Sequence, residues 1–222
     1  MTFLLQALAW ITDPAHQGGP NGIWARLGEH LAYSAIGVLL ACILAVPVGA
    51  WVGHTGRGRG LAVGLSSAAR ALPTLGLVTL LGIGLGIGLV GPMIAFVALA
   101  VPSILAGTYA GIGAADRTAV DGARASGMTE WQVLTRVELA LGLPLLLGGV
   151  RSAFLQVVAT ATLAAYVGAG GLGRYLFLGL RTRDYPQMLA ASLLVVALAL
   201  VADLAFAALQ RLATPAGLRT AR

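Results

Sequence analysis

Long apolar runs make up most of this chain, and polar positions are confined to the segments between them. Five runs are each about twenty residues long: 31–52, 61–81, 92–112, 143–167 and 188–209. A helix of about twenty residues crosses a hydrocarbon core of about 30 Å. A soluble helix would show a polar face, which these runs lack. The pattern therefore predicts an all-α membrane protein with about five transmembrane helices.

The remaining segments divide the chain further. Residues 1–26 begin apolar, but they lack a basic start and a small-residue cleavage site. They are not typical of a secretory signal peptide, and we expect a short interfacial segment. Residues 27–212 form the predicted transmembrane domain, and 213–222 form a tail.

One polar segment, about 114–140, separates the third and fourth predicted spans. It carries seven charged residues and cannot lie in lipid: Asp116, Arg117, Asp121, Arg124, Glu130, Arg136 and Glu138. Two short helices are expected, at 118–126 and 129–136. Gly127 permits a sharp turn between them, and Thr129 with Gln132 has the spacing of a capping box. Asp121 is expected in the first turn of the first helix, where the helix dipole favours a carboxylate.

Composition narrows the possible functions. Only 10% of the residues are charged, against roughly 25% in an ordinary soluble domain. All 14 basic residues are Arg and are scattered at span ends, so the net charge of +6 does not indicate nucleic-acid binding. Cys42 is the single cysteine and the three histidines are far apart, so no disulfide framework or cysteine-based metal site is expected.

The distribution of Arg predicts the orientation in the membrane, because cytoplasmic loops carry an excess of basic residues. With the N-terminus outside, eight Arg face the cytoplasm and four face the exterior. The cytoplasmic set is Arg57, Arg59, Arg117, Arg124, Arg136, Arg211, Arg219 and Arg222, and the exterior set is Arg26, Arg174, Arg181 and Arg183. We therefore expect the N-terminus outside and the C-terminus inside.

Three charges fall within the apolar runs at similar depth: Arg70, Arg151 and Asp203. Charges within a membrane are costly and are usually paired or face a cavity. A pair between Asp203 and either Arg is expected, although the long Arg side chains could instead reach the interface. Gly82, Gly84, Gly86 and Gly88 have the small-residue spacing that permits close helix approach.

The polar segment resembles the cytoplasmic coupling loop of ABC-importer permeases, in which Glu-Ala-Ala is followed at fixed spacing by Gly and by Ile-x-Leu-Pro. Ala123, Gly127 and Leu139 match that pattern outright, whereas Ala140 stands where Pro is usual. The positions with the family's spacing, proposed to contact the ATPase, are Asp121, Gly122, Ala123, Gly127, Val137 and Leu139.

Further segments, in the same order, resemble the permeases of osmoprotectant importers of the glycine betaine/carnitine/choline type. They are 70–75 in the second span, 149–153 and 159–165 in the fourth, and the glycine-rich stretch 166–173. The resemblance implies the type I ABC importer permease fold, with the coupling loop between helices 3 and 4. It also implies an outer gate or docking turn at Gly168, Gly170, Gly171 and Gly173.

The resemblance further implies partners in the cytoplasmic (inner) membrane of a bacterium: a second permease subunit, two cytoplasmic ATPase subunits and an extracellular or periplasmic binding protein. No cofactor is expected on this chain, and ATP and Mg would bind the partner ATPase. A P-loop needs a Lys that reaches the phosphates, and this chain contains no Lys. We expect the binding protein to supply the affinity for the substrate.

Other functions remain as alternatives. Methionine and other amino-acid ABC permeases share the glycine-rich turn. An ion-coupled secondary transporter would use the intramembrane charges but would leave the coupling loop unexplained. An intramembrane protease would need a Ser/His pair or a His-Glu-x-x-His helix, and the chain has neither motif. A passive channel or structural subunit is the remaining alternative.

Overall fold

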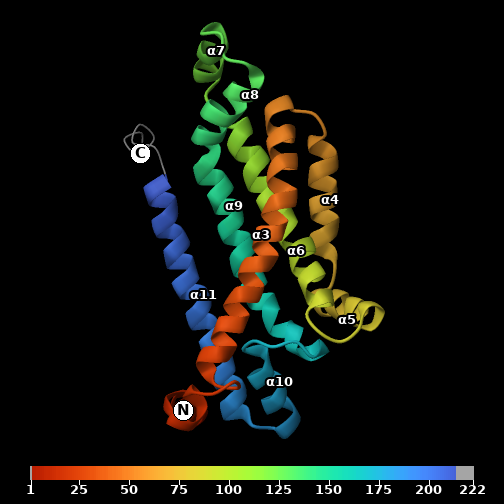
Figure 1. Ribbon diagram of the computed structural model, residues 1–222, viewed down its shortest axis with the longest axis vertical. Helices are drawn as coiled ribbons and strands as arrows, with labels where there is room; N and C mark the ends of the chain where they lie inside the picture. Colours follow the sequence, from red (N-terminus) through yellow and green to blue (C-terminus); the bar gives the residue numbers. More distant parts are fainter. Residues whose placement is uncertain (1, 214–222) are drawn as a thin grey trace. The chain divides into compact units, whose positions relative to one another are not determined.

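The computed structural model describes residues 2–213, apart from the side chain of Arg70 (Figure 1). All regular structure in that range is helical. In chain order the elements are α1 (Thr2–Thr12), α2 (Pro14–Gln17), α3 (Ile23–Thr55), α4 (Arg59–Ala71), α5 (Thr74–Leu85), α6 (Val90–Gly113), α7 (Arg117–Ala125), α8 (Glu130–Gln132), the π-helix η1 (Val133–Glu138), α9 (Leu139–Ala161), the 3-10 helix η2 (Thr162–Val167), α10 (Gly173–Thr182) and α11 (Tyr185–Ala213).

The predicted all-α membrane fold is confirmed. Within the described residues, four helical stretches are long and apolar enough to cross a membrane: α3, α6, the run 130–167 that contains α9, and α11. A fifth span results if α4 and α5 together make one broken span. The predicted tail, 213–222, lies outside the described residues except for Ala213.

The second predicted span, 61–81, is not one continuous helix. Helix α4 ends at Ala71 and α5 begins at Thr74. Pro73 lies at the break, with φ −67° and ψ 116°. Proline has no N–H to donate and disfavours helical conformation in the residue before it. Hydropathy alone does not reveal this break, because apolar residues continue on both sides.

The chain divides into two compact units, each made of three segments. Unit 1 contains Met1–Val38, Leu72–Val97 and Phe154–Ala202, and unit 2 contains Leu39–Ala71, Ala98–Ala153 and Asp203–Arg222. Each of the long helices α3, α6, α9 and α11 is divided, with one part in unit 1 and the other part in unit 2.

Glycines bring the helices of unit 2 close together. A Cβ atom on Gly49 of α3 would lie 2.7 Å from Cβ of Thr108 in α6. Helix α6 also contacts α9, where a Cβ on Gly107 would lie 2.8 Å from Cα of Gly149. Gly111 meets Gly142 in the same way. Small residues allow such backbone contacts between membrane helices.

Close packing was expected at a different run of glycines, 82–88, and the structure supports this expectation only in part. Gly82 does face a neighbour, since its Cβ would lie 2.7 Å from Cγ1 of Val167. Gly84 has open space around it. Gly86 and Gly88 have positive φ angles of 96° and 135° and form the turn between α5 and α6.

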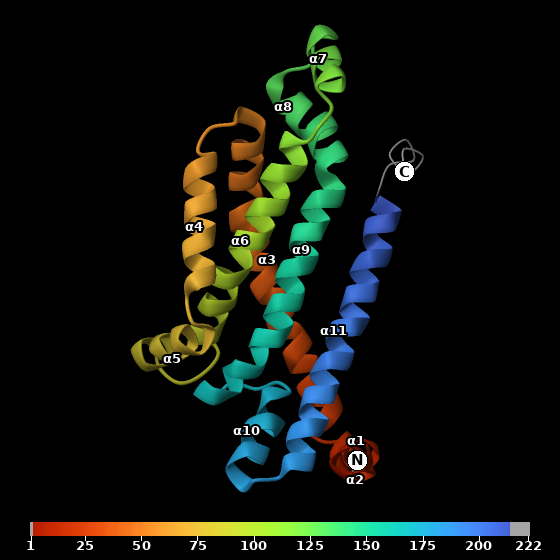
Figure 2. The same cartoon turned by 180° about the vertical axis from the view of Figure 1, so that it is seen from behind.

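Unit 1 has its own apolar cluster, formed by Ile23, Leu172, Tyr175 and Ala191. Figure 2 shows α10 alongside the beginning of α11, and these two helices supply half of the cluster. His30 is fully buried nearby in the same unit, with Nε2 2.9 Å from the carbonyl oxygen of Val158. This contact joins the first part of α3 to the second part of α9.

We expect Gly107→Ala to lower the melting temperature of the purified protein, because its methyl group would meet the backbone of α9. Overpacking of this kind typically costs about 1–3 kcal/mol. Gly64→Ala in α4 is the matched control, since a Cβ there meets nothing within 4 Å. A fluorescence-monitored melt that gives both variants the same midpoint would contradict the assigned packing.

Candidate functional site: the loop between α6 and α9

The polar segment forms a helix–turn–helix at one end of unit 2 (Figure 1). Helix α7 is followed by a turn, and α8 then continues through η1 into α9. The two short helices predicted at 118–126 and 129–136 are thus present, with shifted bounds. The π-helical stretch Val133–Glu138 was not predicted, and π-helical turns are often found at functional sites.

Side chains cap both short helices. The capping box predicted from Thr129 and Gln132 is confirmed: Gln132 donates its backbone N–H to Oγ1 of Thr129, and the Thr129 N–H donates to Oε1 of Gln132 at 2.9 Å. The prediction for Asp121 is wrong. Asp116 is the N-cap of α7 and accepts the Thr118 N–H at 2.7 Å. Asp121 lies beyond the first turn because the helix begins at Arg117.

Gly127 makes the turn between the two helices, as predicted. Its φ angle is +85°, in the region that glycine adopts without steric cost. Its N–H donates to the carbonyl of Arg124, and the next N–H, of Met128, donates to that of Ala123. These two bonds satisfy carbonyls at the end of α7 that have no helical partner.

The motif positions divide into an inward and an outward set. Ala115, Val120 and Val133 form a small core inside the loop, and Ala123 and Val137 pack against it. Asp121 and Gly122 are exposed, and a Cβ on Gly122 would meet nothing within 4 Å. Leu139 is half-buried at the start of α9. The inward positions therefore support the loop itself, and the outward ones are available to a partner.

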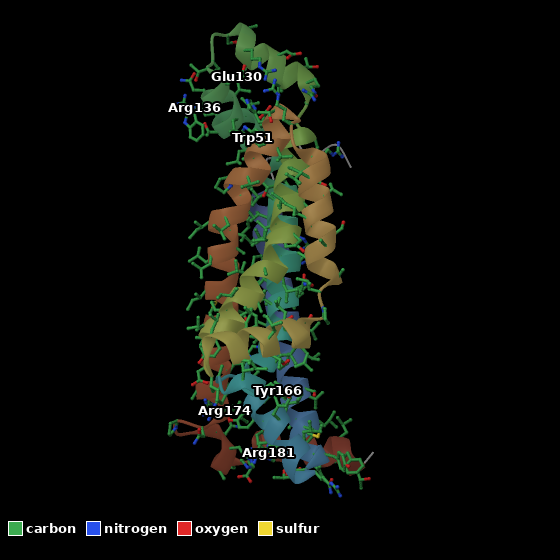
Figure 3. All side chains as sticks on the ribbon, turned by 90° about the vertical axis from the view of Figure 1, so that its right-hand side faces the viewer. Trp51, Glu130, Arg136, Tyr166, Arg174 and Arg181 are labelled. Atoms are coloured by element: carbon green, nitrogen blue, oxygen red, sulfur yellow. The ribbon has the colours of Figure 1, made fainter. Side chains whose placement is uncertain are left out.

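An ionic network holds the loop to the end of α3. Glu130 receives two hydrogen bonds from Arg124, both of 2.9 Å, and this contact raises the pKa of the Arg124 guanidinium. His54 lies with Nδ1 2.6 Å from Oε2 of Glu138 and Nε2 3.2 Å from Oε2 of Glu130. Figure 3 shows Glu130 and Trp51 at this end of unit 2.

His54 was missed as a functional residue because its partners are distant in sequence. It lies 84 residues before Glu138, and no local pattern links the two. The buried position of Glu138, with a side chain only 7% exposed, has no signal in a segment that is otherwise polar. The one hint in the sequence is that His54 lies at the end of a predicted span, on the same side of the membrane as the polar loop.

The glycine turn 168–173 is tightly built rather than open. Gly168 and Gly171 have φ angles of 86° and 82°. Cβ atoms on Gly170 and Gly173 would collide with the Glu29 carboxylate and the Thr162 carbonyl, respectively. Glu29 also accepts the N–H of Gly171 at 2.8 Å. All four predicted positions therefore have a structural reason to be glycine, and larger residues there would disturb the turn itself.

Two of the three intramembrane charges, Arg151 and Asp203, form an ion pair, as their similar depth in the membrane predicted. Arg151 donates from Nε and Nη2 to the two carboxylate oxygens of Asp203, at 2.6 and 2.7 Å. Its Nη1 donates to Oε1 of Gln210 at 3.2 Å, and Gln210 donates to the carbonyl of Pro144. The two charged side chains are about one-third exposed. The side chain of Arg70 lies outside the described part of the chain.

Residues 37–215 match the family described as the inner membrane component of binding-protein-dependent transport systems. The chain belongs to this family. It is 33% identical over 194 residues to the glycine betaine/carnitine/choline transport system permease protein OpuCB of Bacillus subtilis, covering 87% of this chain and 89% of that protein. It is also 33% identical over 199 residues to the osmoprotectant import permease protein OsmW of Salmonella typhimurium, covering 86% and 91%.

Among solved structures, this inner membrane component is similar to an inward-facing form of the MetNI methionine ABC transporter. The TM-score is 0.74 at 21% identity, over 87% of this chain and 96% of that chain. The fold is thus that of a type I ABC importer permease. The chain is a membrane subunit of a transport system and not itself an enzyme, and it is a multi-pass inner membrane protein.

We expect Asp203→Asn to lower the melting temperature and folded yield, because Arg151 would keep its charge without a counter-ion. Adding Arg151→Gln should restore part of the loss. Arg70→Gln is the comparison variant and should not rescue, since Arg151 already contacts both oxygens of Asp203. Rescue by Arg70→Gln alone would show that the functional pair is different.

We expect His54→Leu to destabilise the loop, because it leaves the buried carboxylate of Glu138 without its closest donor. The readouts are the melting temperature and the rate of limited proteolysis within 114–140. The double variant with Glu138→Gln should recover part of the wild-type stability. Equal proteolysis of the wild type and the single variant would remove His54 from the support of the loop.

Proposed function

We propose that this chain is the permease subunit of an ATP-driven importer that moves a quaternary-ammonium osmoprotectant, namely glycine betaine, choline or carnitine. The observation that supports this most is the 33% identity to the OpuCB permease over most of both chains. A methionine permease is the less supported alternative, because the similarity to MetNI is at 21% identity and shows the fold alone. The loop geometry argues against an ion-coupled transporter, which has no use for an exposed helix of this kind.

The proposed complex contains a second permease, either the same chain or a paralogue, two cytoplasmic ATPase subunits that bind ATP and Mg, and the binding protein. We place the N-terminus outside and the C-terminus in the cytoplasm, following the Arg distribution. The loop with α7 and α8 is then cytoplasmic, and the glycine turn and α10 are external. The exposed residues Asp121 and Gly122 of α7 would contact the ATPase.

A rigid loop suits the transmission of movement from an ATPase to the membrane helices. The capping box, the small core and the bidentate Arg124–Glu130 contact all restrict α7 relative to α8. His54 then ties this assembly to α3 in the same unit. Displacement of α7 by a partner would thus be passed to α9 through the continuous helix and to α3 through the ionic network.

The energy source provides the first test. Proteoliposomes containing the permease, its ATPase and the binding protein should accumulate glycine betaine only with internal ATP and Mg. Collapse of the ion gradient should leave uptake unchanged. Uptake that survives ATP removal but requires the gradient would instead support an ion-coupled transporter.

The coupling loop provides the second test. Gly122→Trp should leave the loop folded, because its Cβ points into open space, but should block ATPase binding or uncouple hydrolysis from uptake. Gly122→Ala is the control and should remain functional, since alanine favours helix by about 1 kcal/mol over glycine. The measurements are co-purification of the ATPase and substrate-stimulated hydrolysis. Wild-type values for Gly122→Trp would make this face of the loop a plain connector.

A further inference from the structure

A cavity of about 720 Å³ lies beside the glycine turn in unit 1. Its walls come from the start of α3, from η2 and the turn, and from α10. The lining residues that carry the chemistry are Asn21, Arg26, Tyr166, Arg174, Phe177 and Arg181. Figure 3 shows Tyr166, Arg174 and Arg181 at this end of the unit. Cavities of about 300–1,000 Å³ are typical of small-molecule sites.

The lining is basic and contains no carboxylate. Arg26 already has a counter-ion, because its Nη1 lies 2.7 Å from Oε2 of Glu29, which is not among the lining residues. Arg174 donates from Nε to the carbonyl of Ala169 at 3.3 Å, and no described residue accepts a hydrogen bond from its terminal nitrogens. Arg181 is exposed and forms no hydrogen bond or ion pair with any described residue. Arg181 is thus available to an anion, and Arg174 can donate from its terminal nitrogens although Glu29 lies close enough to interact with it electrostatically.

The same cavity has an aromatic wall. The rings of Tyr166 and Phe177 lie with centroids 5.5 Å apart at 49°, and Tyr166 is 54% exposed. Tyr175 also lines the cavity, and its hydroxyl donates to the carbonyl of Asn21, which fixes its ring. Aromatic faces attract a quaternary ammonium group through the ring quadrupole. The three rings are close in sequence, and the turn between η2 and α10 brings them to one wall of the cavity.

We propose that this cavity is a weak binding site for zwitterionic quaternary-ammonium compounds, with the carboxylate held by Arg174 and Arg181 and the ammonium group on the rings. Guanidinium and carboxylate groups form strong, paired hydrogen bonds. A cation without a carboxylate, such as choline, gains the aromatic contact but is repelled by the two guanidinium groups. The inference rests on the proposed function and adds to it a preference for glycine betaine and carnitine over choline.

Saturation-transfer NMR on the purified permease–ATPase complex, without the binding protein, tests this site directly. The probes are glycine betaine and choline, each at millimolar concentration. The wild type should show the stronger signal for glycine betaine. Arg174→Gln combined with Arg181→Gln should reduce the ratio of betaine affinity to choline affinity by at least about tenfold, the factor expected for the loss of a single charge-assisted hydrogen bond.

Two further variants make the outcome specific. Arg183→Gln removes a charge from the same segment outside the cavity lining and should leave the ratio unchanged. Tyr166→Leu should weaken the binding of both probes. An unchanged ratio in the double variant, or an equal shift in Arg183→Gln, would overturn the proposal.

This result is separable from the test of the proposed function. If the reconstituted wild-type complex shows no ATP-dependent uptake of any quaternary-ammonium compound, the proposed function fails. If it shows uptake but the double variant keeps the wild-type NMR ratio, only the cavity assignment fails.

Discussion

Hydrocarbon offers no hydrogen-bond partner to a peptide backbone, so a chain that crosses it must pair its N–H and C=O groups internally. This constraint explains why all regular structure in residues 2–213 is helical. Breaks in the helices require partners as well, because a buried N–H or C=O group is costly to leave unpaired anywhere in a protein. Where the backbone leaves helical geometry at the glycine turn, the Glu29 carboxylate accepts the freed N–H of Gly171. In α9, Gln210 of α11 adds a side-chain hydrogen bond to the carbonyl of Pro144.

The same scarcity of partners determines how charges are arranged. Asp203 and Arg151 satisfy each other within unit 2, and Glu29 and Arg26 do so within unit 1. Around the second pair, Glu29 also interacts with Arg174, and Arg181 lines a cavity that has no acidic residue in its lining. Both guanidinium groups are exposed beside aromatic rings, and this combination of anion donors with ring faces is the reason to look for a zwitterionic ligand.

The polar loop shows how one motif combines support and contact. Ala123 and Val137 face the loop's own core, so a small or branched apolar residue at these positions has a folding role. Asp121 and Gly122 are exposed on α7 and are not needed for that core. The network through His54 extends the loop's rigidity to α3. A substitution in the motif can thus act on folding or on partner contact, depending on the face it occupies.

The sequence by itself determined the features that depend on local bonding or on the lipid environment: the helical class, the spans, the turn at Gly127 and the capping box at Thr129. These require only residues within about one helical turn, or a count of apolar positions. The family resemblance of the loop likewise needed only the sequence, because Ala123, Gly127 and Leu139 match the family's residues at the family's spacing. The break at Pro73 was missed because hydropathy does not register a lost hydrogen bond.

Only the tertiary structure decided which distant groups meet. Arg151 lies 52 residues from Asp203, His54 lies 84 residues from Glu138, and Glu29 lies 142 residues from Gly171. The glycine pairs between α6 and α9 and the aromatic wall of the cavity likewise depend on how helices pack. Helix packing is set by side-chain shape across whole surfaces, and a linear pattern of polar and apolar residues leaves many such pairings equally compatible.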